Sequence, residues 1–415
     1  MHSRTGHSPR HSTRVYLSAH WASSSAMRFD DTSVAFSDRT DAEVRRAKWL
    51  FTLVGSPTLV KVGSPLLNLA LRLHLPVKGL IKGTVFEHFC GGEDILSCSN
   101  TVDRLYRSRI HSLLDFSAEG KDTEADHDRV MREVMLTIHN AADDRRIPFA
   151  VFKCTGLVRF GLLEKLSAGY PLTQEESTEW NRARGRVVRL CEEAARCDVP
   201  IFMDAEESWI QDAIDRLAHE MMALHNKQKV VVHNTVQLYR HDRLHHLREA
   251  HSNAQKGGYI YGVKLVRGAY MEKERERAAK LGYPSPIHAD KAGTDRDFDS
   301  ATEYCLAHLA SVSVFIGTHN ERSCATASER MRATKMRADD RDVWFGQLLG
   351  MSDNISYTLA QAGHNVVKYV PYGPVADVMP YLIRRAEENT SIAGQTGREL
   401  SLIRREIKRR KAKSA

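Results

Sequence analysis

Two adjacent arginines near the C-terminal end of the sequence carry its clearest chemical signal. Arg384 and Arg385 form a stripe with Tyr381 and Glu388, at spacings that place all four on one face of a helix. A guanidinium is permanently charged and offers a bidentate fork that matches a planar carboxylate. A solvated helix face would look similar. Because this stripe follows directly after a predicted strand, we predict that it binds a carboxylate.

Polar residues also stand at the trailing ends of eight short β-branched or aromatic runs. They are Glu119, Lys153, Asp204, Gln237, Lys264, Arg267, Tyr270, Thr318, His319, Gln347 and Tyr369. Singly, Lys153 could extend to solvent, Asp204 could cap a helix and His319 could be structural. Their recurrence in every run is harder to explain, because strand interiors favour apolar residues.

The runs that precede these polar residues predict the fold. They cover residues 113–119, 149–155, 201–206, 230–239, 263–270, 312–319, 343–349 and 366–372. Each gap between them has room for a crossover helix, as parallel strands require. Eight such units predict the α/β class and a (β/α)8 TIM-type barrel. In a barrel all trailing strand ends meet at one face, where active sites lie.

A doubly wound sheet shares this alternation of strands and helices. It is disfavoured because no G-x-G-x-x-G follows a predicted strand and no G-x-x-x-x-G-K-[ST] occurs. Before the barrel, apolar residues at helical spacing, such as Trp49, Leu50 and Leu53, predict an N-terminal helical arm. We therefore divide the chain into a leader (1–27), the helical arm (28–112), the catalytic barrel (113–403) and a basic tail (404–415).

Composition sets the broad class. The 415 residues are 42% hydrophobic and 27% charged, and no apolar run reaches the ~18 residues of a membrane-spanning helix. The seven cysteines include no C-x-x-C pair, so we expect no disulfide framework and no metal site. Four histidines at 241, 245, 246 and 251 lie in a charged segment and are expected on a solvated surface.

The two ends of the chain differ from the rest. No acidic residue precedes Asp30, so residues 1–27 resemble a transit peptide or a disordered leader, or Met27 is the true start. The formal charge of +8 is concentrated near the other end, where Glu406 is surrounded by basic residues. We expect that end to be a solvated helix terminus, with anionic lipid as the alternative contact and no nucleic-acid partner.

Several motifs stand at the strand ends and on the arginine helix. They are Lys264-Leu-Val-Arg-Gly-Ala-Tyr270, Asp204-Ala-Glu-Glu207, Gly317-Thr-His-Asn320, Tyr369-Val-Pro-Tyr-Gly373, and Tyr381-Leu-Ile-Arg-Arg385 followed by Glu388-Asn389. In these motifs the sequence resembles the proline dehydrogenases, from about residue 28 to 403. The resemblance implies a distorted (β/α)8 barrel with an N-terminal helical arm and non-covalently bound FAD.

The resemblance also implies a reaction. The expected function is oxidation of L-proline to Δ1-pyrroline-5-carboxylate by hydride transfer to flavin N5, the first step of proline catabolism, with electrons passed to a quinone. Quinone delivery implies peripheral membrane contact, which the basic tail could supply. The implied location is cytoplasmic, on the inner face of the membrane, or mitochondrial if the leader is a transit peptide.

The family's functional residues can be carried over position by position. Arg384 and Arg385 would clamp the proline carboxylate with help from Lys153, while Tyr369 and Tyr381 would enclose the ring. Asp204 and Lys264 would form the catalytic pair. The expected FAD contacts are Ala205, Gln237, Arg267, Gly268, Ala269, Thr318 and His319. Some relatives carry Arg and then Lys where this sequence has Lys264 and Arg267, which leaves the detailed role of Lys264 open.

Three alternatives remain at this point. The related hydroxyproline oxidases carry a smaller residue in place of Tyr369, so this bulky side chain predicts a preference for proline over 4-hydroxyproline. A class I aldolase would use Lys153 or Lys264 as a Schiff-base nucleophile. A non-catalytic binding protein would bind its partner through the basic tail alone.

Overall fold

A computed structural model describes residues 27–54, 79, 82–117, 122–391 and 395–414. Almost all of the expected leader, residues 1–27, lies outside the described residues. So do Glu119 and the apolar stretch at 66–71.

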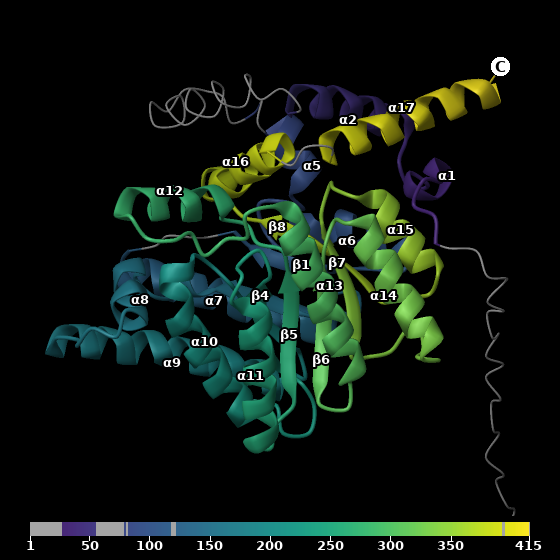
Figure 1. The fold of residues 1–415 in the computed structure, drawn as a ribbon. Helices are drawn as coiled ribbons and strands as arrows, with labels where there is room; N and C mark the ends of the chain where they lie inside the picture. The colour runs from purple at the N-terminus through teal and green to yellow at the C-terminus, as the bar shows by residue number, and fades with distance from the viewer. Residues whose placement is uncertain (1–26, 55–78, 80–81, 118–121, 392–394, 415) are drawn as a thin grey trace, which may run out of the picture.

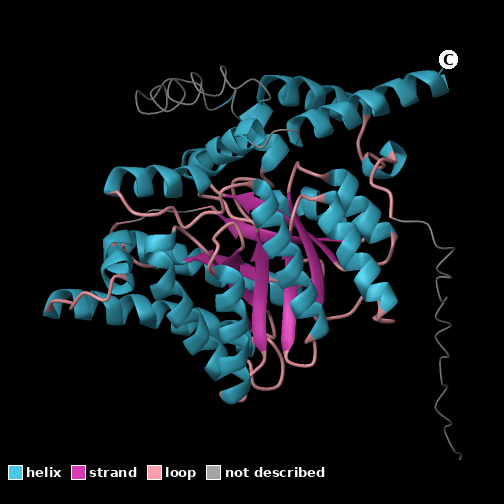
Figure 2. Cartoon of the chain, viewed as in Figure 1, coloured by secondary structure: helices cyan, strands magenta, loops and turns pink. Residues whose placement is uncertain are grey.

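Eight parallel strands form the predicted barrel (Figures 1 and 2). They are β1 (Ile110–Phe116), β2 (Ala150–Lys153), β3 (Ile201–Asp204), β4 (Val232–Gln237), β5 (Tyr261–Val266), β6 (Val312–Gly317), β7 (Val343–Leu348) and β8 (Val366–Tyr372). Each overlaps one of the runs predicted from the sequence. The first run was placed too late, because β1 begins at Ile110 with the polar pair His111 and Ser112, which an apolar criterion does not detect.

The strand ladder runs from β2 through β3, β4, β5, β6, β7 and β8 to β1. Between β8 and β1 the parallel register aligns Tyr369 with Leu113. At the seam between β1 and β2, the backbone N–H of Ser112 donates to the carbonyl of Arg146 at 2.9 Å. The barrel is therefore nearly closed, and the (β/α)8 prediction is confirmed.

Aromatic rings fill the interior of the barrel. The ring of Phe202 lies 4.9 Å from Phe149 and 5.0 Å from Phe315, measured between centroids. Tyr369 packs 6.0 Å from Phe315. The barrel is thus a packed core and not a pore, and these rings form an apolar floor below the polar groups at the carboxyl ends of the strands.

Helices follow every strand, and most of them cover the outside of the barrel, while α12 and α16 lie above it in the view of Figure 1. They are α7 (Glu124–Asp143), α8 (Phe160–Ser167), α9 (Gln174–Arg196), α10 (Ser208–His225), α11 (Arg243–Lys256), α12 (Met271–Leu281), α13 (Lys291–Ala307), α14 (Glu321–Ala333), α15 (Asp353–Gln361) and α16 (Val375–Ser391). Their ends follow local sequence signals: α9, for instance, begins with a capping box between Thr173 and Glu176.

The N-terminal arm and the last helix pack together at the carboxyl end of the barrel (Figure 1). The arm comprises α1 (Thr32–Ala35), α2 (Asp41–Val54), η1 (Lys82–Phe86), α5 (Glu87–Phe89), η2 (Leu96–Cys98) and α6 (Ser99–Arg107), and the last helix is α17 (Gln395–Ser414). Leu402 and Ile403 of α17 share an apolar cluster with Val44 and Phe51 of α2. Residue 404, where we place the start of the basic tail, lies inside α17.

Buried charge also fixes α17. The carboxylate of Glu406 has no exposed surface and accepts hydrogen bonds from Arg409 and Arg410. Arg410 donates further to Asp41 at 2.7 Å and to the carbonyl of Phe36 at 2.9 Å. Among the described helices, none combines the length and the apolar character needed to cross a membrane.

Candidate active site

Asp204, at the end of β3, lies between two lysines, one from the neighbouring strand β2 and one from β5. The Nζ of Lys153, at the end of β2, lies 3.2 Å from Asp204 Oδ2, and Lys264 of β5 donates to Asp204 Oδ1. Lys153 also lies 3.5 Å from the carboxylate of Asp115 on β1. Four strands thus place two ammonium groups and two carboxylates in one cluster.

The cluster is largely buried, with Asp115 and Lys264 fully inside and Lys153 and Asp204 partly exposed, so its electrostatics are strong. Burial by itself would raise the pKa of Asp204, but the ammonium groups of Lys264 and Lys153 outweigh it, and the pKa is lowered. Asp204 is therefore a carboxylate at neutral pH. Asp115 was missed in the sequence, because the strand that carries it was placed three residues too late. An acidic residue inside an apolar run is the signal that could have revealed it.

Tyr369, on β8, covers this cluster. The Nζ of Lys264 donates to the Tyr369 hydroxyl at 2.7 Å and lies 4.7 Å from the centre of its ring. The same ammonium group is 5.4 Å from the Phe202 ring. Lys264 therefore links Asp204 to the proposed ring-binding tyrosine. Burial lowers the pKa of Lys264, while the Asp204 carboxylate and the aromatic faces favour its charged form.

The predicted arginine stripe lies on α16, which leaves the barrel just after β8. Gly373 makes this exit with φ of 140°, a conformation that favours glycine. Arg385 and Tyr381 are both buried, and the Arg385 guanidinium carbon lies 5.2 Å from the Tyr381 ring centre. Arg384 is half-buried. The stripe is therefore not a freely solvated helix face.

The residues expected to hold FAD lie at the ends of β4, β5 and β6. The Gln237 side chain donates to the carbonyl of Glu206 at 2.7 Å and accepts from the backbone N–H of Ala269 at 3.2 Å. Ala205, beside Glu206, is buried. Gly268 has φ of 139°, and a Cβ there would lie 2.5 Å from the ring of Tyr239. Glycine is thus required at this turn.

Arg267 connects the ends of β5 and β6. Its guanidinium pairs with Asp295 at 2.8 Å, donates to the hydroxyl of Ser323 at 2.9 Å and donates to Thr318. Because these three partners come from α13, α14 and the end of β6, the Arg267 guanidinium has a defined position.

His319, two residues beyond β6, has both ring nitrogens engaged. Its Nε2 accepts from the backbone N–H of Leu348 at 3.4 Å, so its Nδ1 carries the proton and donates to the Ser352 hydroxyl at 2.9 Å. Burial lowers the pKa of His319 to about 3, and the charge of Lys368 acts in the same direction. The ring is therefore neutral in the working pH range.

Metal-ligand side chains also gather at the opposite end of the barrel. His139, Glu193 and Cys197 place possible ligand atoms within 4.8 Å of one another. Arg196 donates to both oxygens of the Glu193 carboxylate, at 2.8 and 2.6 Å, which commits that carboxylate to an ion pair. Of the four histidines expected on a solvated surface, His251 is instead buried and bonded to Tyr304 and Ser311, because α11 turns it toward α13.

Comparison with known proteins identifies the family of this chain. Residues 98–398 match a family model described as proline dehydrogenase. This chain belongs to the proline dehydrogenase family. The family resemblance seen in the motifs is therefore confirmed, and the chain is an oxidoreductase, which sets the aldolase alternative aside.

Individual relatives of this proline dehydrogenase family member support the assignment. Mitochondrial proline dehydrogenase 1 of Arabidopsis thaliana is 32% identical over 381 residues, covering 80% of this chain and 76% of the relative. Hydroxyproline dehydrogenase of Xenopus laevis is 32% identical over 426 residues, covering 93% and 90%. A crystal structure of proline utilization A from Bdellovibrio bacteriovorus superposes with a TM-score of 0.69 at 19% identity, covering 90% of this chain and 40% of that longer protein. That likeness concerns the fold.

Proposed function

We propose that this chain oxidises L-proline to Δ1-pyrroline-5-carboxylate, with FAD as cofactor and a quinone as the electron acceptor. The observation that carries the proposal is the buried cluster of Lys153, Asp204 and Lys264 under Tyr369. It lies at the carboxyl end of a barrel whose sequence matches the family model. The paired arginines lie on α16, the helix that follows β8.

The substrate carboxylate would be held by cations. Arg384 and Arg385 offer guanidinium forks and Lys153 offers a point charge, so carboxylate binding would be both strong and oriented. The pyrrolidine ring would lie between Tyr369 and Tyr381. Fixing the ring in this way orients the carbon next to nitrogen, from which the hydride leaves.

Asp204 and Lys264 would act by charge and position. Asp204 is ionised and fixed between two ammonium groups, so it holds both lysines in place. Lys264 in turn fixes the Tyr369 hydroxyl at 2.7 Å. A cation near the flavin would also favour its electron-rich reduced form.

The residues at the ends of β4, β5 and β6 fit an FAD. Gly268 keeps its backbone in a conformation closed to other residues, Arg267 supplies a fixed cation, and His319 supplies a neutral ring. With Ala205, Gln237, Ala269 and Thr318 they are the residues that would hold the cofactor. When bound, FAD would supply the hydride acceptor that no side chain of this site can supply.

Electron delivery to a quinone would place the protein at a membrane surface. Arg404, Arg405, Lys408, Lys411 and Lys413 of α17 are exposed, while Arg409 and Arg410 are paired with Glu406. The exposed cations could contact anionic lipid, at the cytoplasmic face of a membrane or inside a mitochondrion. Sedimentation with anionic vesicles, compared between the full chain and one lacking residues 404–415, tests this part.

One observation favours a second substrate, 4-hydroxyproline. The chain covers 90% of a hydroxyproline dehydrogenase from Xenopus laevis. Against it, the Tyr369 hydroxyl is fixed by Lys264 and would crowd a 4-hydroxyl group.

The proposal is tested by dye reduction with each imino acid and chemical trapping of the pyrroline product. Equal kcat/KM for the two substrates would contradict the preference, and no product from L-proline would contradict the function.

A further inference from the structure

The turn between β7 and α15 has a backbone that needs outside support. Gly350 and Ser352 have φ of 79° and 53°, so Ser352 occupies the left-handed region that residues with a side chain rarely adopt. A strained residue of this kind persists where its surroundings fix it, and such residues often lie at functional sites. The contacts of this turn therefore indicate its role.

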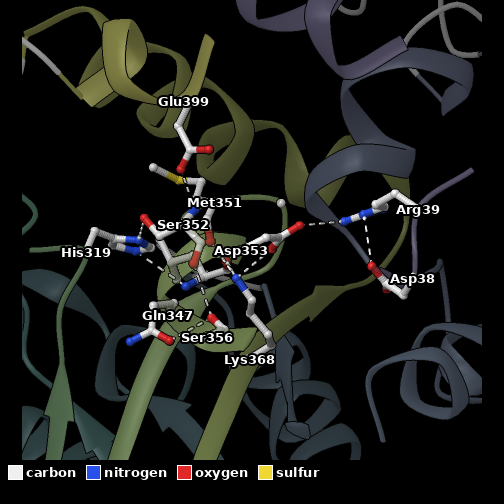
Figure 3. Close-up of polar contacts among 12 residues, drawn as sticks. Asp38, Arg39, His319, Gln347, Met351, Ser352, Asp353, Ser356, Lys368 and Glu399 are labelled. Atoms are coloured by element: carbon white, nitrogen blue, oxygen red, sulfur yellow. Dashed lines mark hydrogen bonds and ion pairs between the residues drawn. The ribbon is translucent and has the colours of Figure 1, made fainter. Parts of the chain in front are cut away.

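Buried charges hold the turn from two sides (Figure 3). Lys368, on β8 beside Tyr369, has no exposed surface, and its Nζ donates to the carbonyls of Met351 and, at 3.3 Å, Leu348. The same Nζ pairs with Asp353 at 2.9 Å. Arg39 of the N-terminal arm pairs with the other oxygen of Asp353 at 3.1 Å.

Glu399, on α17, holds the turn from a third side. Its carboxylate accepts the backbone N–H of Ser352 at 2.5 Å (Figure 3). Burial, together with the Asp353 carboxylate, raises the pKa of Glu399 to about 7. Glu399, whose carboxyl group is costly to ionise, therefore binds Ser352, the strained non-glycine residue of the turn.

This β7–α15 segment also fixes His319 through hydrogen bonds. The backbone N–H of Leu348, the last residue of β7, and the hydroxyl of Ser352 bind the two ring nitrogens, which fixes the orientation of the imidazole and places its proton on Nδ1. A path of hydrogen bonds thus runs from Glu399 through Ser352 to a residue at the carboxyl end of the barrel.

We propose that Glu399 is a positioning residue that, through Ser352, fixes the ring of His319 for contact with the flavin. This inference rests on the proposed function, in which His319 contacts FAD. The role proposed for Glu399 makes α17 part of the cofactor site, although no residue of α17 is expected to touch FAD.

The ionisation of Glu399 adds a pH dependence. The titratable and charged groups that face it are Asp353 of α15, Lys368 of β8, Arg39, Glu43 and Arg46 of the arm, and His88 of α5, which is neutral because burial lowers its pKa to about 4. Because the pKa of Glu399 is raised in the folded protein, its contribution to stability is fully present below its ordinary pKa and is lost as the pH rises through about 7. Its contribution to FAD binding should have the opposite trend and increase as Glu399 ionises.

The test measures FAD affinity and stability separately. Flavin-free wild type, Glu399→Gln and Ser352→Ala are titrated with FAD by fluorescence, and the Tm of each flavin-free protein is measured at pH 8. Glu406→Gln is the matched control, because Glu406 is a buried carboxylate of the same helix that binds Arg409 and Arg410 instead of the turn. Ser352→Ala keeps the backbone N–H and loses the hydroxyl.

The proposal predicts that Glu399→Gln weakens FAD binding about tenfold at pH 8 without lowering the Tm. Ser352→Ala should weaken binding as well, and the double variant should be little weaker than either single one, since both act on one path. Glu406→Gln should lower the Tm and leave FAD affinity nearly unchanged.

Three results would overturn the proposal. They are an unchanged FAD affinity in Glu399→Gln, a loss of FAD affinity in Glu406→Gln as large as that in Glu399→Gln, or a loss in the double variant equal to the product of the two single losses. A wild-type protein that binds no FAD would instead contradict the proposed function itself.

Discussion

Replacing Arg385 by alanine should raise the KM for L-proline about a hundredfold. Arg385 is only 7% exposed and packs against the Tyr381 ring, so water replaces its contacts poorly. A hydrogen bond to a charged group in such surroundings contributes roughly 1.5–3 kcal/mol, and the upper value corresponds to about two orders of magnitude in KM. The value of kcat should change less, because the carboxylate contact is the same before and during hydride transfer.

Steady-state kinetics with an artificial electron-accepting dye measure this effect. Arg385→Lys keeps the charge and loses the bidentate fork, so its KM should lie between those of wild type and Arg385→Ala. The control is Arg129→Ala: Arg129 lies on α7 and pairs with Asp377 of α16 at 3.5 Å, so its loss loosens the helix without removing the proposed clamp. An unchanged KM in Arg385→Ala, or an equal rise in Arg129→Ala, would refute the reasoning.

Three further changes probe other parts of the site. Asp204→Asn leaves the buried Lys264 ammonium group without its carboxylate, while Lys153 keeps Asp115, and should cost about 3 kcal/mol in denaturant unfolding. Because the pKa of Asp204 is lowered, its stabilising effect is present above its ordinary pKa and is lost as the pH falls through the lowered value. The free energy of unfolding of the variant should therefore fall less steeply than that of wild type as the pH is lowered. Tyr369→Ser removes the ring that would crowd a 4-hydroxyl group, and the ratio of kcat/KM for 4-hydroxyproline to that for proline should rise about tenfold or more; an unchanged ratio would exclude Tyr369 as the specificity residue. Gly268→Ala would place a Cβ 2.5 Å from the Tyr239 ring, so the purified protein should contain much less flavin, and full occupancy would show that the turn can adapt.

The barrel was predictable because its signals are local. Each buried strand is a short β-branched or aromatic run, and the polar residues that end these runs converge by the geometry of any parallel barrel. Lys153, Asp204, Lys264 and Tyr369 were therefore grouped correctly before their contacts were known. The error in β1 arose because tertiary packing buries Ser112 and partly buries His111, whose ring lies 5.3 Å from that of Trp344 between centres.

The charged network around the β7–α15 turn could not be predicted in the same way. Arg39, Asp353, Lys368 and Glu399 lie on four different elements, and the folded arm and α17 bring Arg39 and Glu399 to the other two (Figure 3). In the sequence Arg39, Asp353 and Glu399 look like ordinary surface charges. Lys368, next to Tyr369 in a buried strand, was the one visible sign that a counter-charge had to lie nearby.

The absorption spectrum of the purified protein, recorded without oxygen before and after addition of L-proline, tests the central claim most directly. Proline oxidation with FAD predicts a flavin absorption band that bleaches on addition of proline and returns when a quinone is added. A protein without a flavin band, or a band that proline leaves unchanged, would contradict the account.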